Sequence, residues 1–242
     1  MRTNFTLLLL TFLLGDLSAQ STAYVLNAGP TLGLQKFDNG GDQQVLFKYH
    51  VALAIESVNN EDDKSAGFLQ VGYHVKGSAN RLSLNFPNGN SGNFSREFRY
   101  NNLSLAIGAK QKFPLGTAGT SRYFYYGAIR GDYTLSTNID ELSNQFSGYT
   151  DINAPQVAFM NRWMFGLSIG GGLQFPLSEL MGGQLTLSVC PDVTNQYRQP
   201  AIPNVTNPSG GGNVTIPERR IRNTAVELSF GLRLLHKVEY IE

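Results

Sequence analysis

The chain has 242 residues, a formal net charge of +1 and a single cysteine, Cys190. The near-neutral charge excludes nucleic-acid binding through bulk basicity, and one cysteine excludes an internal disulfide and a multi-cysteine metal site. After the N-terminus, no segment is apolar over the ~20 residues that a transmembrane helix needs.

The N-terminus predicts a secretory signal peptide over residues 1–19. Arg2 supplies the positive charge, Leu7 to Leu14 the apolar run, and Leu17 to Ala19 the small-residue cleavage site. The alternative, an N-terminal membrane anchor, needs a longer apolar run. We therefore expect residues 20–242 to form one exported β domain.

Apolar residues at alternate positions mark the first four of eight predicted strands. The clearest is Val45 to Glu56, where one parity is apolar and the other mostly polar or small. Because a strand points successive side chains to opposite faces, this pattern predicts one apolar and one polar face. The other three are Ala23 to Phe37, a strand around Leu69 to Lys76, and Phe98 to Phe113. Two short turns separate the first three, and a long polar loop is expected over residues 77–96.

The second half of the chain repeats the pattern. The expected strands are Arg122 to Ser136, Met160 to Phe175, Gln184 to Asn195 and Asn223 to Leu235. The connections between them are long at residues 137–158 and 196–221, and short at residues 114–120 and 177–182. This alternation is typical of outer-membrane barrels, which have short periplasmic turns and longer outer loops.

These patterns predict an all-β fold, an eight-stranded antiparallel up-and-down transmembrane β-barrel in the cell outer membrane. A soluble lipocalin-like barrel or β-sandwich also alternates, but with its apolar face inward. In this chain, the face opposite the apolar one is rich in Gly, Ala, Ser, Thr and Gln and poor in the Lys and Glu that soluble strands expose. Such small polar residues suit the narrow lumen of an eight-stranded barrel.

Ionisable residues on the polar parity predict a network inside the barrel. Its expected members are Lys48, His50, Glu56, His74, Lys110, Arg130, Asp132, Arg162, Glu227 and Arg233. A lumen too narrow for a water column must pair such charges, so we interpret the network as a structural plug. A narrow pore or a small-ligand pocket is the alternative.

Hydrolytic chemistry is the third alternative. His74 and Asp132 are the most suggestive acid–base pair, but the pattern singles out no nucleophile for them to activate. We therefore predict no catalytic residues, no cofactor site and no metal site.

Residues at the strand ends indicate contacts with the membrane. Arg219, Arg220 and Arg222 cluster where the last long loop meets the last strand, near the expected position of lipopolysaccharide phosphates. A solvated loop end is the alternative. Aromatic residues on the apolar parity predict interfacial girdles. They are Tyr24, Tyr49, Tyr73, Tyr123, Tyr125, Tyr133, Trp163 and Phe175.

Four segments carry Gly, Tyr and Leu at the spacing of barrel strands: Phe98 to Phe113, Tyr123 to Gly131, Phe165 to Phe175 and Asn223 to Leu232. In this pattern they resemble PorT-like outer-membrane barrels of the Bacteroidota. The founding member of that family is tied to type IX secretion. The resemblance implies an outer-membrane barrel with a non-enzymatic structural or partner-docking role linked to protein secretion. The expected partners are outer-membrane lipid, lipopolysaccharide and a protein still to be identified, with no nucleic acid.

Overall fold

The structure is a computed structural model that describes residues 21–37, 43–58, 64–85, 91–116, 120–144, 156–207 and 210–236. The predicted signal peptide lies outside these residues, as do the turns at residues 38–42 and 59–63. No helix among the described residues is long and apolar enough to cross a membrane.

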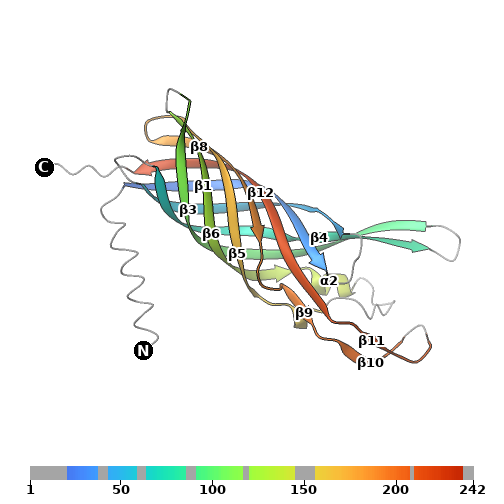
Figure 1. Cartoon of the computed structure of the whole chain (residues 1–242). Helices are drawn as coiled ribbons and strands as arrows, with labels where there is room; N and C mark the ends of the chain where they lie inside the picture. The colour runs from blue at the N-terminus through green and yellow to red at the C-terminus, as the bar shows by residue number, and fades with distance from the viewer. Residues whose placement is uncertain are drawn as a thin grey trace, which may run out of the picture.

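Within the described residues, eight long strands form a closed antiparallel ring (Figure 1). They are β1 (Ser21–Phe37), β3 (Leu46–Val58), β4 (Ser65–Asn85), β5 (Ser91–Leu115), β6 (Ser121–Thr137), β7 (Trp163–Pro176), β8 (Met181–Pro191) and β12 (Arg219–His236). Each strand pairs with the next long strand in the chain, and β12 pairs back onto β1. The predicted eight-stranded up-and-down barrel is confirmed.

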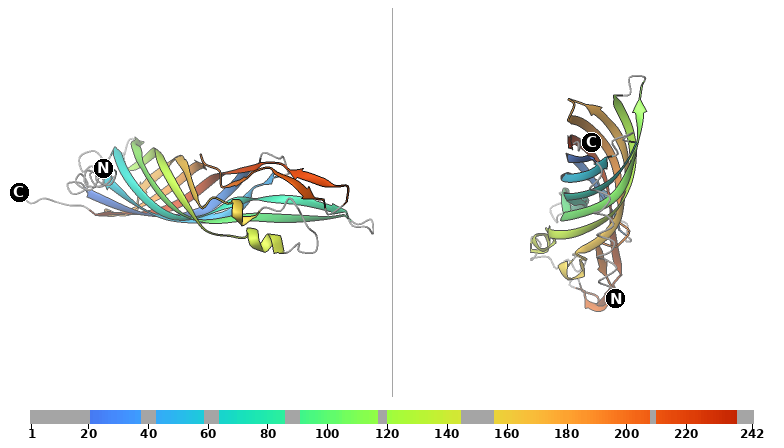
Figure 2. Two further views of the ribbon diagram at one scale, coloured as in Figure 1. Left: turned by 90° about the horizontal axis from the view of Figure 1, so that it is seen from below. Right: turned by 90° about the vertical axis from the view of Figure 1, so that its left-hand side faces the viewer.

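The two ends of the barrel differ. The start of β1 and the end of β12 lie together at one end, where Thr22 pairs with His236, and we call it the terminal end (Figures 1 and 2). The short elements gather at the opposite end, the loop end. They are β2 (Gln43–Gln44), α2 (Ile139–Asn144), η2 (Val157–Phe159), β9 (Tyr197–Gln199), β10 (Ile202–Thr206) and β11 (Asn213–Ile216).

The long loop expected over residues 77–96 was a wrong prediction. β4 and β5 continue through most of it as a paired hairpin, from Gly77 opposite Arg99 to Asn85 opposite Ser91. This segment is rich in Asn, Gly and Ser, so it lacks the apolar alternation that marks a strand in a membrane. A ladder needs only backbone hydrogen bonds, which this polar sequence can still make. The loop expected over residues 196–221 likewise contains β9, β10, β11 and the start of β12.

The outer surface of the ring is apolar and its interior is polar. Outward side chains such as Phe47, Ile129 and Trp163 are about two-thirds exposed, whereas the inward Arg130 and Asp132 are buried. The closed ring pairs the backbone groups of its strands, which lipid cannot satisfy, and the apolar belt suits lipid rather than water. The protein is therefore a β-barrel of the cell outer membrane, and the soluble alternative is wrong.

One facing assignment changes at the loop end. Val75 has the same parity as Leu69 and Val71, which face outward, and alternation therefore predicts that it faces lipid. It is buried instead, because other strands crowd against β4 there. β2 pairs with β4 beside Ala79, and β1 approaches it so closely that a Cβ on Gly33 would lie 2.5 Å from the carbonyl oxygen of Gly77. Only glycine fits at position 33 without a shift of the backbone.

Aromatic side chains mark both edges of the apolar belt. At the loop end, the rings of Tyr133 and Trp163 lie 4.8 Å apart, and those of Tyr49 and Tyr73 lie 6.2 Å apart. At the terminal end, Phe113 stacks on Tyr123 with a centroid distance of 5.1 Å. Such girdles sit at the two membrane–water interfaces of a barrel.

Candidate functional site

An ionic cluster fills the lumen toward the loop end. It consists of Lys76 on β4, Arg130 and Asp132 on β6, and Asp192, which follows β8. The Lys76 ammonium contacts the carboxylate of Asp132 and lies 2.9 Å from that of Asp192. The Arg130 guanidinium lies 3.2 Å from Asp132 and 2.9 Å from Asp192. Two cations therefore balance two carboxylates in a buried setting, which we call the loop-end cluster.

A second ionic cluster lies toward the terminal end, and among its described residues cations outnumber carboxylates. Glu56 on β3 contacts Lys110 and lies 3.8 Å from Lys112 and 3.5 Å from Arg233. Lys110 also donates to the side-chain oxygen of Gln184 at 3.1 Å. One buried carboxylate thus faces three cations in this terminal-end cluster.

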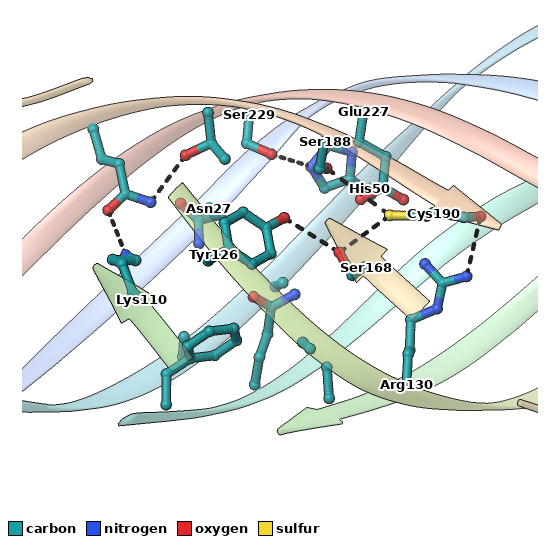
Figure 3. Close-up of a pocket in the computed structure, with 18 of the residues that line it drawn as sticks. Asn27, His50, Lys110, Tyr126, Arg130, Ser168, Ser188, Cys190, Glu227 and Ser229 are labelled. Atoms are coloured by element: carbon teal, nitrogen blue, oxygen red, sulfur yellow. Dashed lines mark hydrogen bonds between the residues drawn. The ribbon is translucent and has the colours of Figure 1, made fainter. Parts of the chain in front are cut away.

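A pair of histidines, His50 and His74, lies between the two clusters, and Figure 3 labels His50 together with Lys110 of one cluster and Arg130 of the other. The rings of His50 and His74 stack with centroids 5.5 Å apart, on directly opposite positions of β3 and β4. His74 Nδ1 lies 2.7 Å from the Glu227 carboxylate, and His50 Nε2 lies 2.8 Å from Ser229 Oγ. The second nitrogen of His50 lies 3.0 Å from Thr31 Oγ1, so both of its ring nitrogens have partners.

Amide and hydroxyl groups close the lumen beyond the loop-end cluster. Asn223 accepts from Gln35 at 2.7 Å and donates to Gln196 at 2.9 Å. Gln196 donates to Thr134 at 3.1 Å, and Thr134 donates to Asn102 at 2.8 Å. These side chains come from strands on several sides of the ring, so their hydrogen bonds span it.

The cavity between the two ionic clusters is small. A cavity of about 40 Å³ is lined by residues that include His50, Tyr126, Ser168, Cys190 and Ser229. At about 10–15 Å³ for each water, it holds on the order of three waters. Small side chains do not widen the lumen, because larger neighbours fill the space beside them. A Cβ on Gly170, for example, would lie 2.7 Å from the Tyr126 ring.

The cavity brings together groups that could act in acid–base or nucleophilic chemistry. His50 and Ser229 are within hydrogen-bond reach, as a base and a nucleophile must be. Thr31, rather than a carboxylate, orients His50, and the cavity has no room for a substrate beside the serine. The suggested pair of His74 and Asp132 does not form, because His74 pairs with Glu227, while Asp132 accepts a hydrogen bond from Lys76 and forms an ion pair with Arg130. The described residues contain no group of His, Cys, Asp and Glu side chains suited to a metal ion.

Most of the residues expected in the lumen network are buried there. His50, Glu56, His74, Lys110, Arg130, Asp132, Glu227 and Arg233 are all buried. Lys48 lies at the loop-end rim, where its ammonium is 2.9 Å from the Glu97 carboxylate and partly exposed.

Arg162 is a correction to the expected network. Its side chain is exposed, and its guanidinium lies 3.5 Å from the Tyr133 hydroxyl. The alternation failed here because Arg162 lies in a bend before the first residue of β7, where side chains no longer follow the parity of the strand.

Sequence reasoning did not single out Gln196. It follows β8 in a segment expected to be a loop, so no alternation indicated that its side chain would point inward. The Arg219, Arg220 and Arg222 cluster divides between two faces. Arg220 and Arg222 are exposed on the outward parity of β12, and Arg219 has the opposite parity.

Comparison with known proteins gives structural similarity only. No protein-family model matches the chain, and no curated protein matches its sequence. The crystal structure of Neisserial surface protein A is 11% identical, covers 88% of this chain and 97% of its own, and has a TM-score of 0.42. OprG from Pseudomonas aeruginosa is 12% identical, with coverages of 90% and 98% and a TM-score of 0.44. AlkL in lipid bilayers is 10% identical, with coverages of 92% and 93% and a TM-score of 0.41. Similarities at this level carry no information on function.

Breaking the loop-end cluster should destabilise the barrel strongly. Lys76→Met leaves two buried carboxylates facing one arginine, and loss of one partner from a buried ion pair costs about 3–5 kcal/mol. Lys48→Met is the matched control, because the partly exposed Lys48–Glu97 pair is worth about 1 kcal/mol or less. Urea unfolding in phospholipid vesicles measures both changes.

A charge-balanced double variant tests the cause of this loss. The double variant Lys76→Met, Asp132→Asn leaves one cation, Arg130, and one carboxylate, Asp192, in the cluster. Its loss in free energy of unfolding should therefore be smaller than the sum of the losses caused by the two single substitutions. Equal and small effects of Lys76→Met and Lys48→Met would show that the cluster does not stabilise the fold.

Proposed function

We propose that this protein is a non-conducting, non-enzymatic barrel that anchors a protein-docking surface at the outer face of the outer membrane. The proposal rests on one observation, which is the difference between the lumen and the loop end. The lumen is closed at successive levels by buried polar side chains, whereas strands at the loop end extend beyond the ring.

Closure of the lumen supports the absence of conduction. The loop-end cluster, the histidine pair and the terminal-end cluster follow one another along the barrel, and each joins side chains from different strands. An ion entering this space would have to break buried ion pairs, each of which is costly to disrupt. The cavity of about 40 Å³ leaves no room for a solute, which also supports the absence of catalysis.

The loop end supplies the surface for docking. β4 and β5 remain paired from Arg81 opposite Ser95 to Asn85 opposite Ser91, beyond the two residues of β2 that pair with β4. A second hairpin, β10 with β11, projects beside β12 (Figure 1). Within the described part of the chain, no further strand pairs with the outer edges of these two hairpins, and such edges can add a strand from a partner.

The orientation of the barrel is part of the proposal. If the chain enters the outer membrane after a signal peptide, its short turns face the periplasm and the loop end faces outward. The resemblance to PorT-like barrels suggests a finer role, in which the docked partner belongs to a protein secretion system. Loss of secreted cargo on deletion of the protein would support this finer role, and unchanged secretion would contradict it.

A narrow anion pore is the second candidate. Glu56 faces Lys110, Lys112 and Arg233, so cations outnumber carboxylates among the described residues of the terminal-end cluster. A cavity of about 180 Å³ lies beside it at the terminal end, lined in part by Arg122, Gln174 and Arg233. A path through the barrel would favour anions, because rings of cationic side chains select for them.

Conductance separates the two candidates. The folded, heat-modifiable protein should give no steady current in planar lipid bilayers, because the buried ion pairs leave no continuous water path. A stable anion-selective current that disappears when Lys110 and Arg130 are replaced would contradict the closed barrel and favour the pore.

Site-specific photo-cross-linking in intact cells tests the docking role. A photoreactive residue at the exposed Ser95 on β5 should form adducts with protein, because this strand extends beyond the ring. The same residue in place of Ile129, which is 65% exposed on the lipid-facing surface, is the matched control and should form adducts with lipid. The same adducts at both positions would contradict a docking surface at the loop end.

A further inference from the structure

A patch of basic side chains lies on the outward face of the barrel at the loop end. Its members are Lys36 on β1, Arg198 on β9, and Arg220 and Arg222 on β12, and all are exposed. Lys36 is directly opposite Arg222 in the pairing of β1 with β12, and Arg198 is directly opposite Arg220 in the pairing of β9 with β12. We call this group the rim patch.

The rim patch places like charges opposite each other on neighbouring strands. Such cross-strand pairs destabilise a sheet unless an anion lies between them. Glu218 supplies one carboxylate, which lies 2.8 Å from the guanidinium of Arg220 and 3.9 Å from that of Arg198. The hydrogen bond from Arg220 lowers the pKa of Glu218, so this carboxylate is ionised at neutral pH. Among the described residues, the patch therefore has four cations and one carboxylate, which is an excess of positive charge.

The geometry of Arg222 suits a bound anion. Its Nε donates to the side-chain oxygen of Asn195 at 2.8 Å, which fixes the plane of the guanidinium. A guanidinium has five N–H donors, and its terminal nitrogens can bind two oxygens of a phosphate at once. An oriented arginine is therefore better suited to a phosphate than a flexible lysine.

The depth of the patch matches the lipid headgroups. The outward side chains of β12 are apolar from Leu234 to Val226, a span of about 20 Å along the membrane normal at ~3.3 Å per residue and a tilt of ~40°. Arg222 lies four residues beyond Val226, or about 30 Å from Leu234 on the same scale. The apolar band of such barrels is about 25 Å tall, so Arg222 lies just outside it.

We propose that the rim patch binds the phosphate groups of a phosphorylated glycolipid of the outer leaflet, such as the lipid A part of lipopolysaccharide. The charge excess recognises the phosphates, and the outward apolar side chains of β12 beside it can contact the acyl chains. This inference rests on the orientation given under the proposed function, with the loop end outward. It does not depend on whether the barrel conducts or docks a protein.

Binding of lipid A to the purified full chain tests the proposal. Native mass spectrometry in detergent should show wild-type protein with bound bis-phosphorylated lipid A. The triple variant Arg198→Gln, Arg220→Gln, Arg222→Gln should bind it at least about tenfold more weakly, since each basic residue near a lipid surface contributes appreciably. Arg219→Gln is the matched control for the single variant Arg222→Gln: each removes one positive charge, but Arg219 lies on the opposite face of β12, so its change should weaken binding less than about twofold and less than Arg222→Gln does.

Two further binding measurements test whether the phosphates of the lipid and the charge of the arginines are what the site recognises. Dephosphorylated lipid A should bind wild-type protein as weakly as the triple variant binds the phosphorylated form. Changing the same three arginines to Lys keeps the charge and should restore part of the affinity, because an ammonium group still attracts phosphate but does not bind two of its oxygens as a guanidinium does. Heat-modifiability of each variant on a gel provides an independent check of folding.

Three results would overturn the proposal. One is equal binding of phosphorylated lipid A to wild-type protein and to the folded triple variant. Another is equal binding of the phosphorylated and dephosphorylated lipids. The third is displacement of lipid A by millimolar inorganic phosphate alone, which would show a site for free phosphate rather than for a lipid. None of these results would change the conductance expected of the barrel.

Discussion

The rest of this structure depends on the pairing of buried charges, and the contacts of Lys76 with Asp132 and Asp192 are the clearest case. Pairing is required because a ring of eight strands is too narrow to hydrate the charges that line it. Each charge inside must find a partner from another strand, and the loop-end cluster does so with equal numbers of cations and carboxylates. The same contacts join β4, β6 and the segment after β8 across the lumen. Pairing these charges therefore stabilises the ring of strands and also blocks its lumen.

This constraint moves function to the ends of the molecule. The outer surface of the ring contacts lipid, and the side chains in the interior bind one another. The loop end and the rim are therefore the surfaces that remain available to bind other molecules. There the sequence departs from alternation, with a hairpin from β4 and β5, a second hairpin from β10 and β11, and the rim patch. A docking role and a lipid contact are compatible, because the hairpins project away from the ring while the rim patch faces the membrane.

The alternation of apolar residues predicts the strands inside the membrane, because lipid on one face and a narrow lumen on the other enforce a period of two. It places His50, Glu56, Arg130 and Glu227 correctly inside the barrel. It fails where that contrast ends: at Arg162, in a bend before β7, and in the hairpin after Gly77, whose polar strands carry no such period. The partners of each charge, such as Glu227 for His74, depend on contacts between distant strands, which periodicity cannot reveal.

Reactivity of the native cysteine tests closure of the lumen most directly. Cys190 is buried and lines the small cavity between the two ionic clusters, so a reagent can reach it only through one of them. A charged, water-soluble methanethiosulfonate reagent should leave Cys190 unmodified in the folded barrel and modify it fully after unfolding in denaturant. Rapid modification of the folded protein would show a water path to the middle of the lumen and would contradict a barrel closed by buried ion pairs.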